Sequence, residues 1–219
     1  MRVGIIVAMD SEYALLQAAL ASQKGRIGVH QVWVSKSGIG KVNAALMASE
    51  LIAQHQVDCV LNTGVAGSAD DSVDVMGIVV GGEVRYHDVW CGDGNEKGQV
   101  QGLPACFRAD DLLLQTMRQS ASDESRVHYG LICSGDKFIT TADEIWAIKC
   151  DFPQALAVDM ESAAIAQVCH LRNVPFLSMR VISDKPTATS DHRRQYADFW
   201  RAAADSTFGA VVKMIEMLP

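Results

Sequence analysis

Two carboxylates stand where an apolar strand pattern gives way to an alanine-rich helix pattern at residues 157–164. They are Asp159 and Glu161, and Met160 lies between them. Carboxylates at the start of a buried helix cost several kcal/mol of folding free energy unless polar groups meet them. One interpretation is that these acids bind the hydroxyl groups of a ligand. The alternative is that they cap the helix and complement its dipole.

Two further acids follow other apolar strand patterns. Asp184 comes directly after the apolar residues 181–182, and Glu12 follows residues 3–8 at the opening of an expected helix. For Glu12, the simpler interpretation is complementation of that helix dipole. A pair of carboxyl groups can act as general acid and general base if one of them keeps its proton at neutral pH. Burial in an apolar site raises the pKa of a carboxyl group in that direction.

Glycine-rich segments follow two more strand patterns. Residues 37–43 lie between an expected strand and an expected helix, as a dinucleotide-binding fingerprint would, but Asn43 stands where the third glycine belongs. A tight turn into a packed helix is the alternative interpretation. Residues 62–67 are small, and such a segment lets backbone amides approach a flat ligand closely. The six histidines show no metal-ligand spacing, so the sequence predicts no metal site.

Apolar strand patterns alternate with helical patterns along the whole chain. Several strands are apolar on both faces, which is typical of a central sheet covered by helices on each side. The sequence therefore predicts a single α/β domain over residues 1–219 with three layers, α/β/α. The expected strands are residues 3–8, 29–35, 57–63, 78–86, 127–133, 156–158 and 175–182, and the expected helices are 11–20, 41–54, 110–120, 142–149, 160–171 and 193–217.

In such sheets, ligands bind at the carboxyl ends of the strands. Five polar or glycine-rich segments come just after strands, so we expect them to converge on one crevice. Thr141 and Glu144 also form the pattern of a capping box that opens a helix. The five segments are residues 9–12, 62–67, 134–139, 159–161 and 183–184.

Composition argues against several classes of protein. The chain is 49% hydrophobic and 21% charged, which is ordinary for a globular domain. A net charge of −7 argues against general affinity for nucleic acid, and the apolar runs are shorter than the ~18 residues of a membrane span. Residue 1 leads directly into a strand, so no secretory signal is expected. The six cysteines lack paired spacing, which is typical of reduced thiols, and we expect a cytoplasmic protein without nucleic-acid or membrane partners.

Taken in order, these segments resemble the 5′-methylthioadenosine/S-adenosylhomocysteine nucleosidases, the hydrolytic branch of the nucleoside phosphorylase family. The resemblance implies a nucleoside phosphorylase-like fold with a mixed central sheet. It also implies hydrolysis of the N-glycosidic bond of both nucleosides to adenine and a 5-substituted ribose, in methionine salvage and methyl-cycle recycling, without a metal or redox cofactor. It spans nearly the whole chain and rests on residues 4–12, 37–45, 62–67, 109–111, 134–139, 157–161, 168–170 and 182–184.

The resemblance implies a role for each residue that matches the family motifs. Glu12 is expected to be the general base that activates water, and Asp184 the general acid toward adenine N7, with Ser183 holding its carboxyl group. Glu161 is expected to bind the ribose hydroxyls, and Arg180 to help orient the water. The remaining expected contacts are Met9 and Met160 beside the sugar, Phe138 stacked on adenine, and Ile139, Ala66 and Gly67 at the ring edges.

Four features depart from the family pattern, and one of them is the region at residues 20–35, which is shorter than expected. Val65 stands where bacterial nucleosidases often carry a serine, and Asp159 replaces the more usual glutamate. Residues 89–97 match the stretch that a partner subunit places over the 5′ group, but here this stretch is mostly polar. The resemblance still implies a homodimer, whereas the preferred 5′ substituent stays open.

Other functions remain as alternatives. An aminofutalosine hydrolase would use the same chemistry on a different 5′ group. A phosphate-dependent purine nucleoside phosphorylase would need several cationic groups, whereas residues 9–12 are acidic and would repel phosphate. A non-catalytic nucleoside-binding or storage protein would have lost its acids, but Glu12 and Asp184 are both present. A dinucleotide-binding protein would rest on the incomplete fingerprint at residues 37–43 alone.

Overall fold

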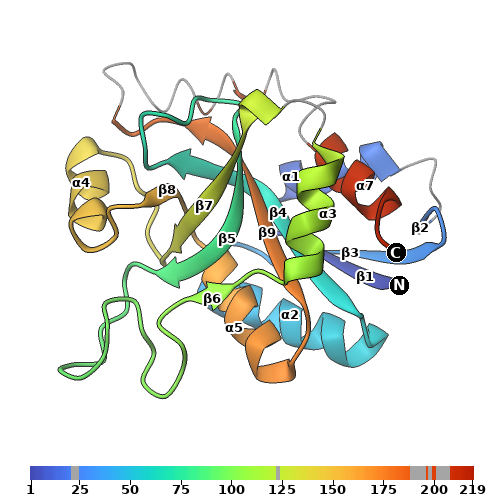
Figure 1. The fold of residues 1–219 in the computed structure, drawn as a ribbon, viewed down its shortest axis with the longest axis horizontal. Coiled ribbons are helices and arrows are strands. Elements are labelled where there is room, and N and C mark those ends of the chain that lie inside the picture. The colour runs from blue at the N-terminus through green and yellow to red at the C-terminus, as the bar shows by residue number, and fades with distance from the viewer. Residues whose placement is uncertain (21–24, 122–123, 188–195, 197–198, 201–207) are drawn as a thin grey trace.

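The computed structural model describes residues 1–20, 25–121, 124–187, 196, 199–200 and 208–219 (Figure 1). Within these residues, nine strands join in one sheet with both parallel and antiparallel pairs, so the prediction of a mixed sheet is confirmed. The strands are β1 (Arg2–Val7), β2 (Arg26–Ile27), β3 (His30–Lys36), β4 (Cys59–Ser68), β5 (Ile78–Tyr86), β6 (Phe107–Arg108), β7 (Val127–Ser134), β8 (Ala155–Asp159) and β9 (Phe176–Asp184).

Helices cover both faces of the sheet, which confirms the three-layer prediction. On one face α2 and α5 lie side by side (Figure 1), and α1, α3 and α7 cover the other face. Alternate side chains of β1 pack against the two helical layers: Ile6 packs toward α2 and α5, and Ile5 and Val7 pack toward the helices on the opposite face. The described helices are α1 (Asp10–Leu20), α2 (Lys41–His55), α3 (Asp111–Ser120), α4 (Ala142–Asp151), α5 (Ser162–Arg172) and α7 (Gly209–Glu216), with a 3₁₀ turn at Glu124–Arg126.

Five strands close into a ring, which was not predicted from the sequence. β4 pairs with β9, β9 with β5, β5 with β7, and β7 with β8. β8 then returns to the end of β4 through the antiparallel pairs Gly67–Val158 and Ser68–Ala157. The register of β4 against β9 shifts between Ala66 and Gly67, and such an irregularity bends a strand. The end of β4 can therefore leave β9 and meet β8.

Most predicted elements form, with shifted ends. β4 extends to Ser68, beyond the expected end at residue 63, and α5 begins at Ser162, so Met160 and Glu161 precede the helix. The short strands β2 and β6 were not predicted. Of the expected helix at residues 193–217, the structure shows α7, while 193–195, 197–198 and 201–207 lie outside the described residues.

The capping box on α4 is confirmed. Thr141 Oγ1 accepts a hydrogen bond from the Glu144 N–H at 3.3 Å, and Glu144 Oε2 accepts one from the Thr141 N–H at 3.1 Å. These bonds satisfy backbone groups that a helix start would otherwise leave without partners. The loop that precedes α4, which carries Phe138 and Ile139, therefore has a fixed end.

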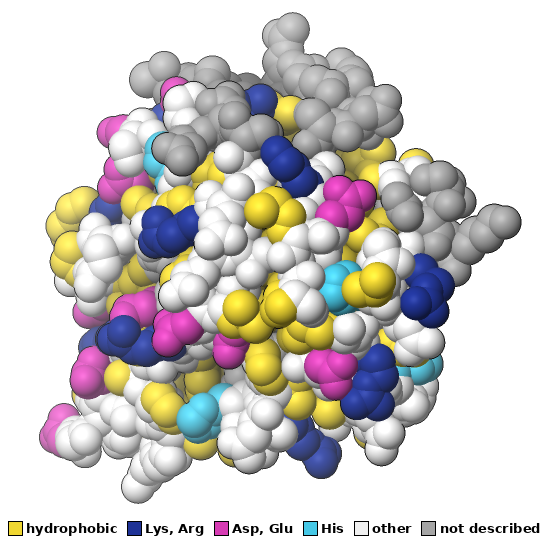
Figure 2. Space-filling model, turned by 45° about the vertical axis from the view of Figure 1, so that its right-hand side comes forward, with side chains coloured by type: hydrophobic (Ala, Val, Ile, Leu, Met, Phe, Trp, Pro, Cys, Tyr) yellow, Lys and Arg dark blue, Asp and Glu magenta, His cyan; other side chains and the backbone are white. Residues whose placement is uncertain are grey.

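Charged side chains of both signs lie on the surface (Figure 2). On the face drawn in Figure 2, acidic and basic side chains lie interspersed over the described residues. Among the helices that the structure describes, none is both long and apolar enough to cross a bilayer. The six cysteines, all of them described, are free thiols.

Candidate active site

The ends of β1, β4, β7, β8 and β9 meet around one cleft, where the structure brings the five predicted segments together. The empty volume of this cleft, with its open mouth included, is about 630 Å³. Ten of the residues predicted from the sequence line it: Met9, Glu12, Ala66, Gly67, Phe138, Ile139, Met160, Glu161, Ser183 and Asp184. The wall is completed by Ala8, Ile39, Val65, Lys137, Val158, Asp159 and Tyr196.

Glu12 lies in the first turn of α1 and is 1% exposed. Its Oε2 accepts hydrogen bonds from the N–H groups of Ala8 at 2.8 Å and Met9 at 2.9 Å, and its Oε1 accepts one from the Val65 N–H at 2.8 Å. Burial raises the pKa of Glu12, while Arg180 and these backbone donors pull the pKa partly back. The bond to β4 goes beyond helix-dipole complementation, because it ties the carboxylate to a second wall of the cleft.

Asp184 is the last residue of β9 and is 2% exposed. Ser183 Oγ lies 2.7 Å from Asp184 Oδ1 and 3.2 Å from the carbonyl oxygen of Ala66. The hydroxyl thus connects the carboxyl group to β4. Glu12 comes from α1 and Asp184 from the end of β9, and because both line the same cleft, the two acids can act on one bound molecule.

Arg180 is fully buried behind the cleft wall and does not line the cleft. Its Nη2 lies 2.6 Å from Asp159 Oδ2 and 3.5 Å from Glu161 Oε2. Burial lowers the pKa of Arg180, but the surrounding carboxylates outweigh it, so the pKa is raised. The family resemblance implies that this arginine helps to orient the attacking water, and in the structure it lies behind the cleft wall, paired with Asp159 and Glu161.

A network of small polar side chains around Arg180 was missed in the sequence. Asn62 Oδ1 accepts a hydrogen bond from Arg180 Nη2 at 2.6 Å, and Ser162 Oγ lies 3.0 Å from Asn62 Oδ1 and 2.8 Å from Ser178 Oγ. Ser162 also donates to the Asp159 carboxylate. The available signal was the presence of Asn62 and Ser178 inside apolar strands, since buried polar groups need partners.

The two acids of the segment at residues 157–164 have different roles. Asp159 Oδ2 accepts a hydrogen bond from the Ser162 N–H at 3.2 Å, so the capping interpretation applies to Asp159 in addition to its ion pair. Glu161 makes no capping bond to α5, and its Oε1 accepts from the Gly40 N–H at 3.0 Å. Burial is the main cause of the raised pKa of Glu161, which Arg180 lowers and Asp159 raises.

The glycine-rich segment at residues 37–43 is a tight turn into α2. Gly38 and Gly40 have φ angles of +86° and +94°, which favour glycine. Glu161 accepts from the Gly40 N–H, and Asp136 Oδ1 accepts from the Lys41 N–H at 2.8 Å. Because carboxylates of the protein occupy these amides, the dinucleotide-binding interpretation has no support here.

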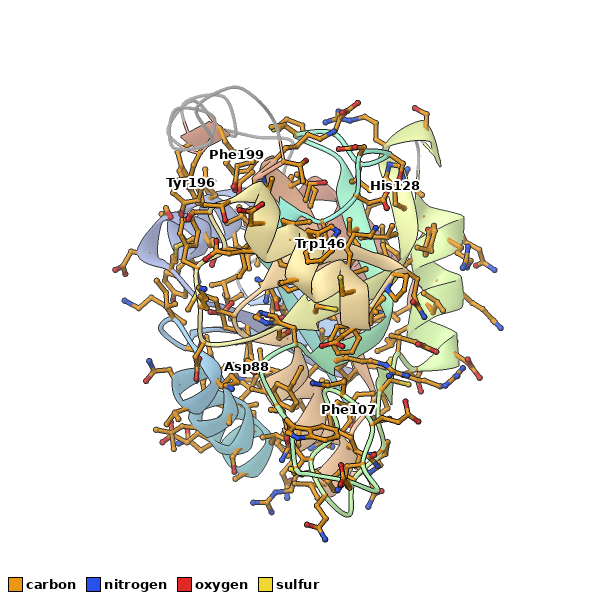
Figure 3. All side chains as sticks on the ribbon, turned by 90° about the vertical axis from the view of Figure 1, so that its left-hand side faces the viewer. Asp88, Phe107, His128, Trp146, Tyr196 and Phe199 are labelled. Atoms are coloured by element: carbon orange, nitrogen blue, oxygen red, sulfur yellow. The ribbon has the colours of Figure 1, made fainter. Side chains whose placement is uncertain are left out.

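Asp88 joins the start of α2 to the loop that carries Phe138. Its Oδ2 accepts hydrogen bonds from Lys41 Nζ and from the Asp136 N–H, both at 2.8 Å. Figure 3 shows Asp88 beside the N-terminal end of α2. The same helix end therefore holds Glu161 on one side and the loop at residues 134–139 on the other.

An aromatic wall stands at the mouth of the cleft. Phe138 is 54% exposed, and its ring lies edge-on to Tyr196 with 6.0 Å between centroids. The Tyr196 hydroxyl lies 3.5 Å from Met9 Sδ. Tyr196 falls within the helix expected at residues 193–217 but was not predicted as a site residue; Figure 3 shows it near Phe199 at one end of the molecule.

Charges around the cleft are predominantly negative. Glu12, Glu161 and Asp184 line it together with Asp159, and the buried cation Arg180 is already paired with two of these acids. Lys137, which also lines the cleft, pairs with Glu144 at 2.8 Å. Among the described residues, no group of three or more His, Cys, Asp or Glu side chains could hold a metal ion. The arrangement suits acid–base chemistry on a neutral or cationic molecule, and it disfavours an anion.

Comparisons with known proteins agree with this geometry. The sequence model of the Phosphorylase superfamily matches residues 2–216. A 5′-methylthioadenosine/S-adenosylhomocysteine nucleosidase of Tolumonas auensis is 36% identical over the full length of both chains.

Solved structures are similar over almost the entire chain. The 5′-methylthioadenosine/S-adenosylhomocysteine nucleosidase of Neisseria meningitidis in complex with methylthio-immucillin-A is 32% identical and has a TM-score of 0.90. The match covers 98% of this chain and 98% of that one. The S-adenosylhomocysteine nucleosidase of Streptococcus pyogenes in complex with 5-methylthiotubericidin is 30% identical with a TM-score of 0.91, over 100% of this chain and 98% of that one.

Proposed function

This chain belongs to the Phosphorylase superfamily, and on that premise we propose that it hydrolyses the N-glycosidic bond of 5′-methylthioadenosine and S-adenosylhomocysteine. The products would be adenine and the 5-substituted ribose, a reaction of methionine salvage and of methyl-cycle recycling. The observation that carries the proposal is the pair of buried acids, Glu12 and Asp184, in the walls of one cleft.

The reaction needs an acid and a base on different sides of the nucleoside. Adenine is a poor leaving group as an anion, so in our proposal Asp184 donates a proton to N7 and adenine leaves neutral. The ribose then gains oxocarbenium character, and Glu12 removes a proton from the water that attacks the anomeric carbon. Each proton-transfer group contributes ~10²–10⁴-fold to such reactions, which corresponds to roughly 3–5 kcal/mol of transition-state stabilisation.

The remaining cleft residues would bind the nucleoside. Glu161 accepts hydrogen bonds from the ribose hydroxyls, and Met9 and Met160 pack beside the sugar. Phe138 stacks on adenine, while the backbone at Ile139, Ala66 and Gly67 meets the ring edges. All of these residues line the cleft. Arg180 acts on the water through the carboxylates that it holds, because it is fully buried.

The charge of the cleft favours hydrolysis over phosphorolysis. A phosphate dianion would lie against Glu12 and Glu161, while Arg180 is occupied by Asp159 and Asn62. A site for phosphate would need free cationic donors. A non-catalytic binding protein would have no need of Glu12 and Asp184 as buried acids.

We further propose that the protein works as a homodimer in the cytoplasm. On α2 the side chains of Val42 and Leu46 are 78% and 58% exposed, and Leu171 on the neighbouring α5 is 58% exposed. Apolar side chains gathered on neighbouring helices are typical of subunit interfaces. Free cysteines support a reducing compartment. A Leu46→Glu variant should shift the sedimentation coefficient from that of a dimer to that of a monomer, and unchanged sedimentation would contradict this.

The deciding experiment is adenine release from methylthioadenosine, S-adenosylhomocysteine and aminofutalosine, each with and without phosphate. We expect Glu12→Gln and Asp184→Asn to fold normally and to lose ~10²–10⁴-fold in turnover. Asp10→Asn is the matched control, because Asp10 lies on the same helix with its side chain 89% exposed. Full turnover in either variant of the acids, or strict dependence on phosphate, would contradict the proposal.

A further inference from the structure

Gly64 lies on β4 at the point where two charged side chains meet the backbone. A Cβ atom at this position would overlap Glu12 Oε1 and would lie 2.8 Å from Arg180 Nη1 and 2.9 Å from Glu12 Cδ. Carbon atoms in ordinary contact stay about 3.5–4.0 Å from their neighbours. The base and the buried arginine therefore pack directly against the backbone, with no space between them for even a methyl group.

Neither neighbour can move aside cheaply. Three backbone N–H groups hold the Glu12 carboxylate, and one of them belongs to Val65, the residue next to Gly64. Arg180 is 0% exposed, and its Nη2 and Nε atoms are bound by Asp159, Asn62 and Ser162. A side chain at position 64 would have to break one of these two sets of bonds.

We propose that Gly64 is a positioning residue for the base: its missing side chain lets the Glu12 carboxylate reach the Val65 N–H and lie close to Arg180. This inference rests on the proposed role of Glu12. The φ angle of Gly64 is +142°, which also favours glycine, so the backbone and the packing require the same residue.

The position of the carboxylate sets its acidity. The charge of Arg180 and the Val65 N–H both lower the pKa of Glu12 against the effect of burial. The other titratable groups around it, Glu161, Asp184 and Tyr196, are acids and cannot replace that cation. A methyl group that pushes Oε1 away from the Val65 N–H and from Arg180 therefore raises the pKa of Glu12.

The test is the pH dependence of kcat/KM for Gly64→Ala. The control is Gly82→Ala on β5, where an added Cβ would have nothing within 4 Å. We expect the acid limb to move upward in Gly64→Ala only, by about one pH unit, so that kcat/KM at low pH falls about tenfold. At high pH the loss should be much smaller. A folded Gly64→Ala enzyme with the acid limb of the wild type would overturn the proposal.

A stability measurement covers the case in which Gly64→Ala folds poorly. In a double-mutant cycle with Glu12→Ala, the carboxylate is absent, so the overlap of the added Cβ with Glu12 Oε1 and Cδ is removed and only the contact with Arg180 Nη1 remains. Backbone strain at position 64 is the same in both backgrounds, so it cancels in the cycle. We expect Gly64→Ala to lower Tm markedly in the wild type and much less in the Glu12→Ala background. Equal losses in both backgrounds would overturn the proposal.

These outcomes are separate from a failure of the proposed function. Full turnover by Glu12→Gln would show that Glu12 is not the base, and the proposed function would lose its mechanism. If Glu12→Gln is inactive but Gly64→Ala keeps the acid limb of the wild type, only the proposed role of Gly64 is refuted.

Discussion

Arg180 is the single buried cation among the cleft acids in the described part of the chain, and Arg180→Met isolates its contribution. Methionine keeps much of the side-chain length but removes the charge and all five donors. Asp159 and Glu161 then face each other without a cation, and Asn62 loses a donor at 2.6 Å. Removing one partner of a buried ion pair costs about 3–5 kcal/mol. We expect a loss of this size in the free energy of unfolding at pH 8.

The loss should depend on pH in a defined direction. Burial already raises the pKa of Glu161 from its ordinary value of 4.5 to about 7, although Arg180 lowers it. Without Arg180, the pKa values of Glu161 and Glu12 rise further. A carboxyl group whose pKa is raised by folding stabilises the fold at low pH, and this contribution is lost as the pH rises through the folded-state pKa. The deficit of the variant should therefore be small near pH 5 and grow toward pH 8.

Urea unfolding at both pH values measures this directly. The matched control is Arg108→Met, since the Arg108 side chain is 77% exposed and pairs with Glu83 on the surface. Exposed pairs contribute roughly 0–1 kcal/mol, so the control should be almost unchanged at either pH. A stability for Arg180→Met within 1 kcal/mol of the wild type at pH 8, or a large deficit that is equal at both pH values, would refute the reasoning.

Three further predictions concern the cleft loop and the helix that follows it. Phe138→Ala should raise KM by about 5–150-fold, because stacking on a base contributes about 1–3 kcal/mol; the exposed Trp146→Ala on α4 should leave KM unchanged. Asp136→Ala should raise KM with little change in Tm, because the Lys41 N–H loses its acceptor and the loop that carries Phe138 loses this bond to the start of α2. Asp136→Asn keeps an acceptor oxygen and should restore binding. Thr141→Ala should lower the free energy of unfolding by about 1 kcal/mol, as calorimetry would show, since it removes the cap of α4.

The longer strands were predictable because short apolar runs stop at polar or glycine residues, whereas the end of β4 and the short strands β2 and β6 were not predicted. Val3 to Val7 and the residues before Asp184 show this pattern, and they form β1 and β9. The ring was not predictable, because its closure depends on two residue pairs, Gly67–Val158 and Ser68–Ala157. Such a contact between distant segments leaves no periodic signal in either strand.

Within the site, the residue types predicted which acids line the cleft, but they did not predict how deeply each charged side chain is buried. The sequence pointed to Glu12, Asp184 and Glu161, and the structure brings them to one cleft. The sequence could not show that Arg180 lies behind the cleft wall. Every residue of β9 is buried, so the alternation of its side chains does not distinguish the face toward the core from the face toward a ligand. The partners of Arg180 were missed for the same reason.

Closure of the five-strand ring dictates the order in which the chain can mature during synthesis. One edge of β4 finds β1 early, but its other edge waits for β9, and β4 ends at Ser68 whereas β9 begins at Phe176. Until the ribosome has made that late strand, an apolar strand edge stays without a partner and is open to chaperones or to aggregation. Glu12 is made near the beginning of translation and Asp184 near its end, so under the proposed mechanism a chain that stops before residue 184 has the base without the acid and should be inactive.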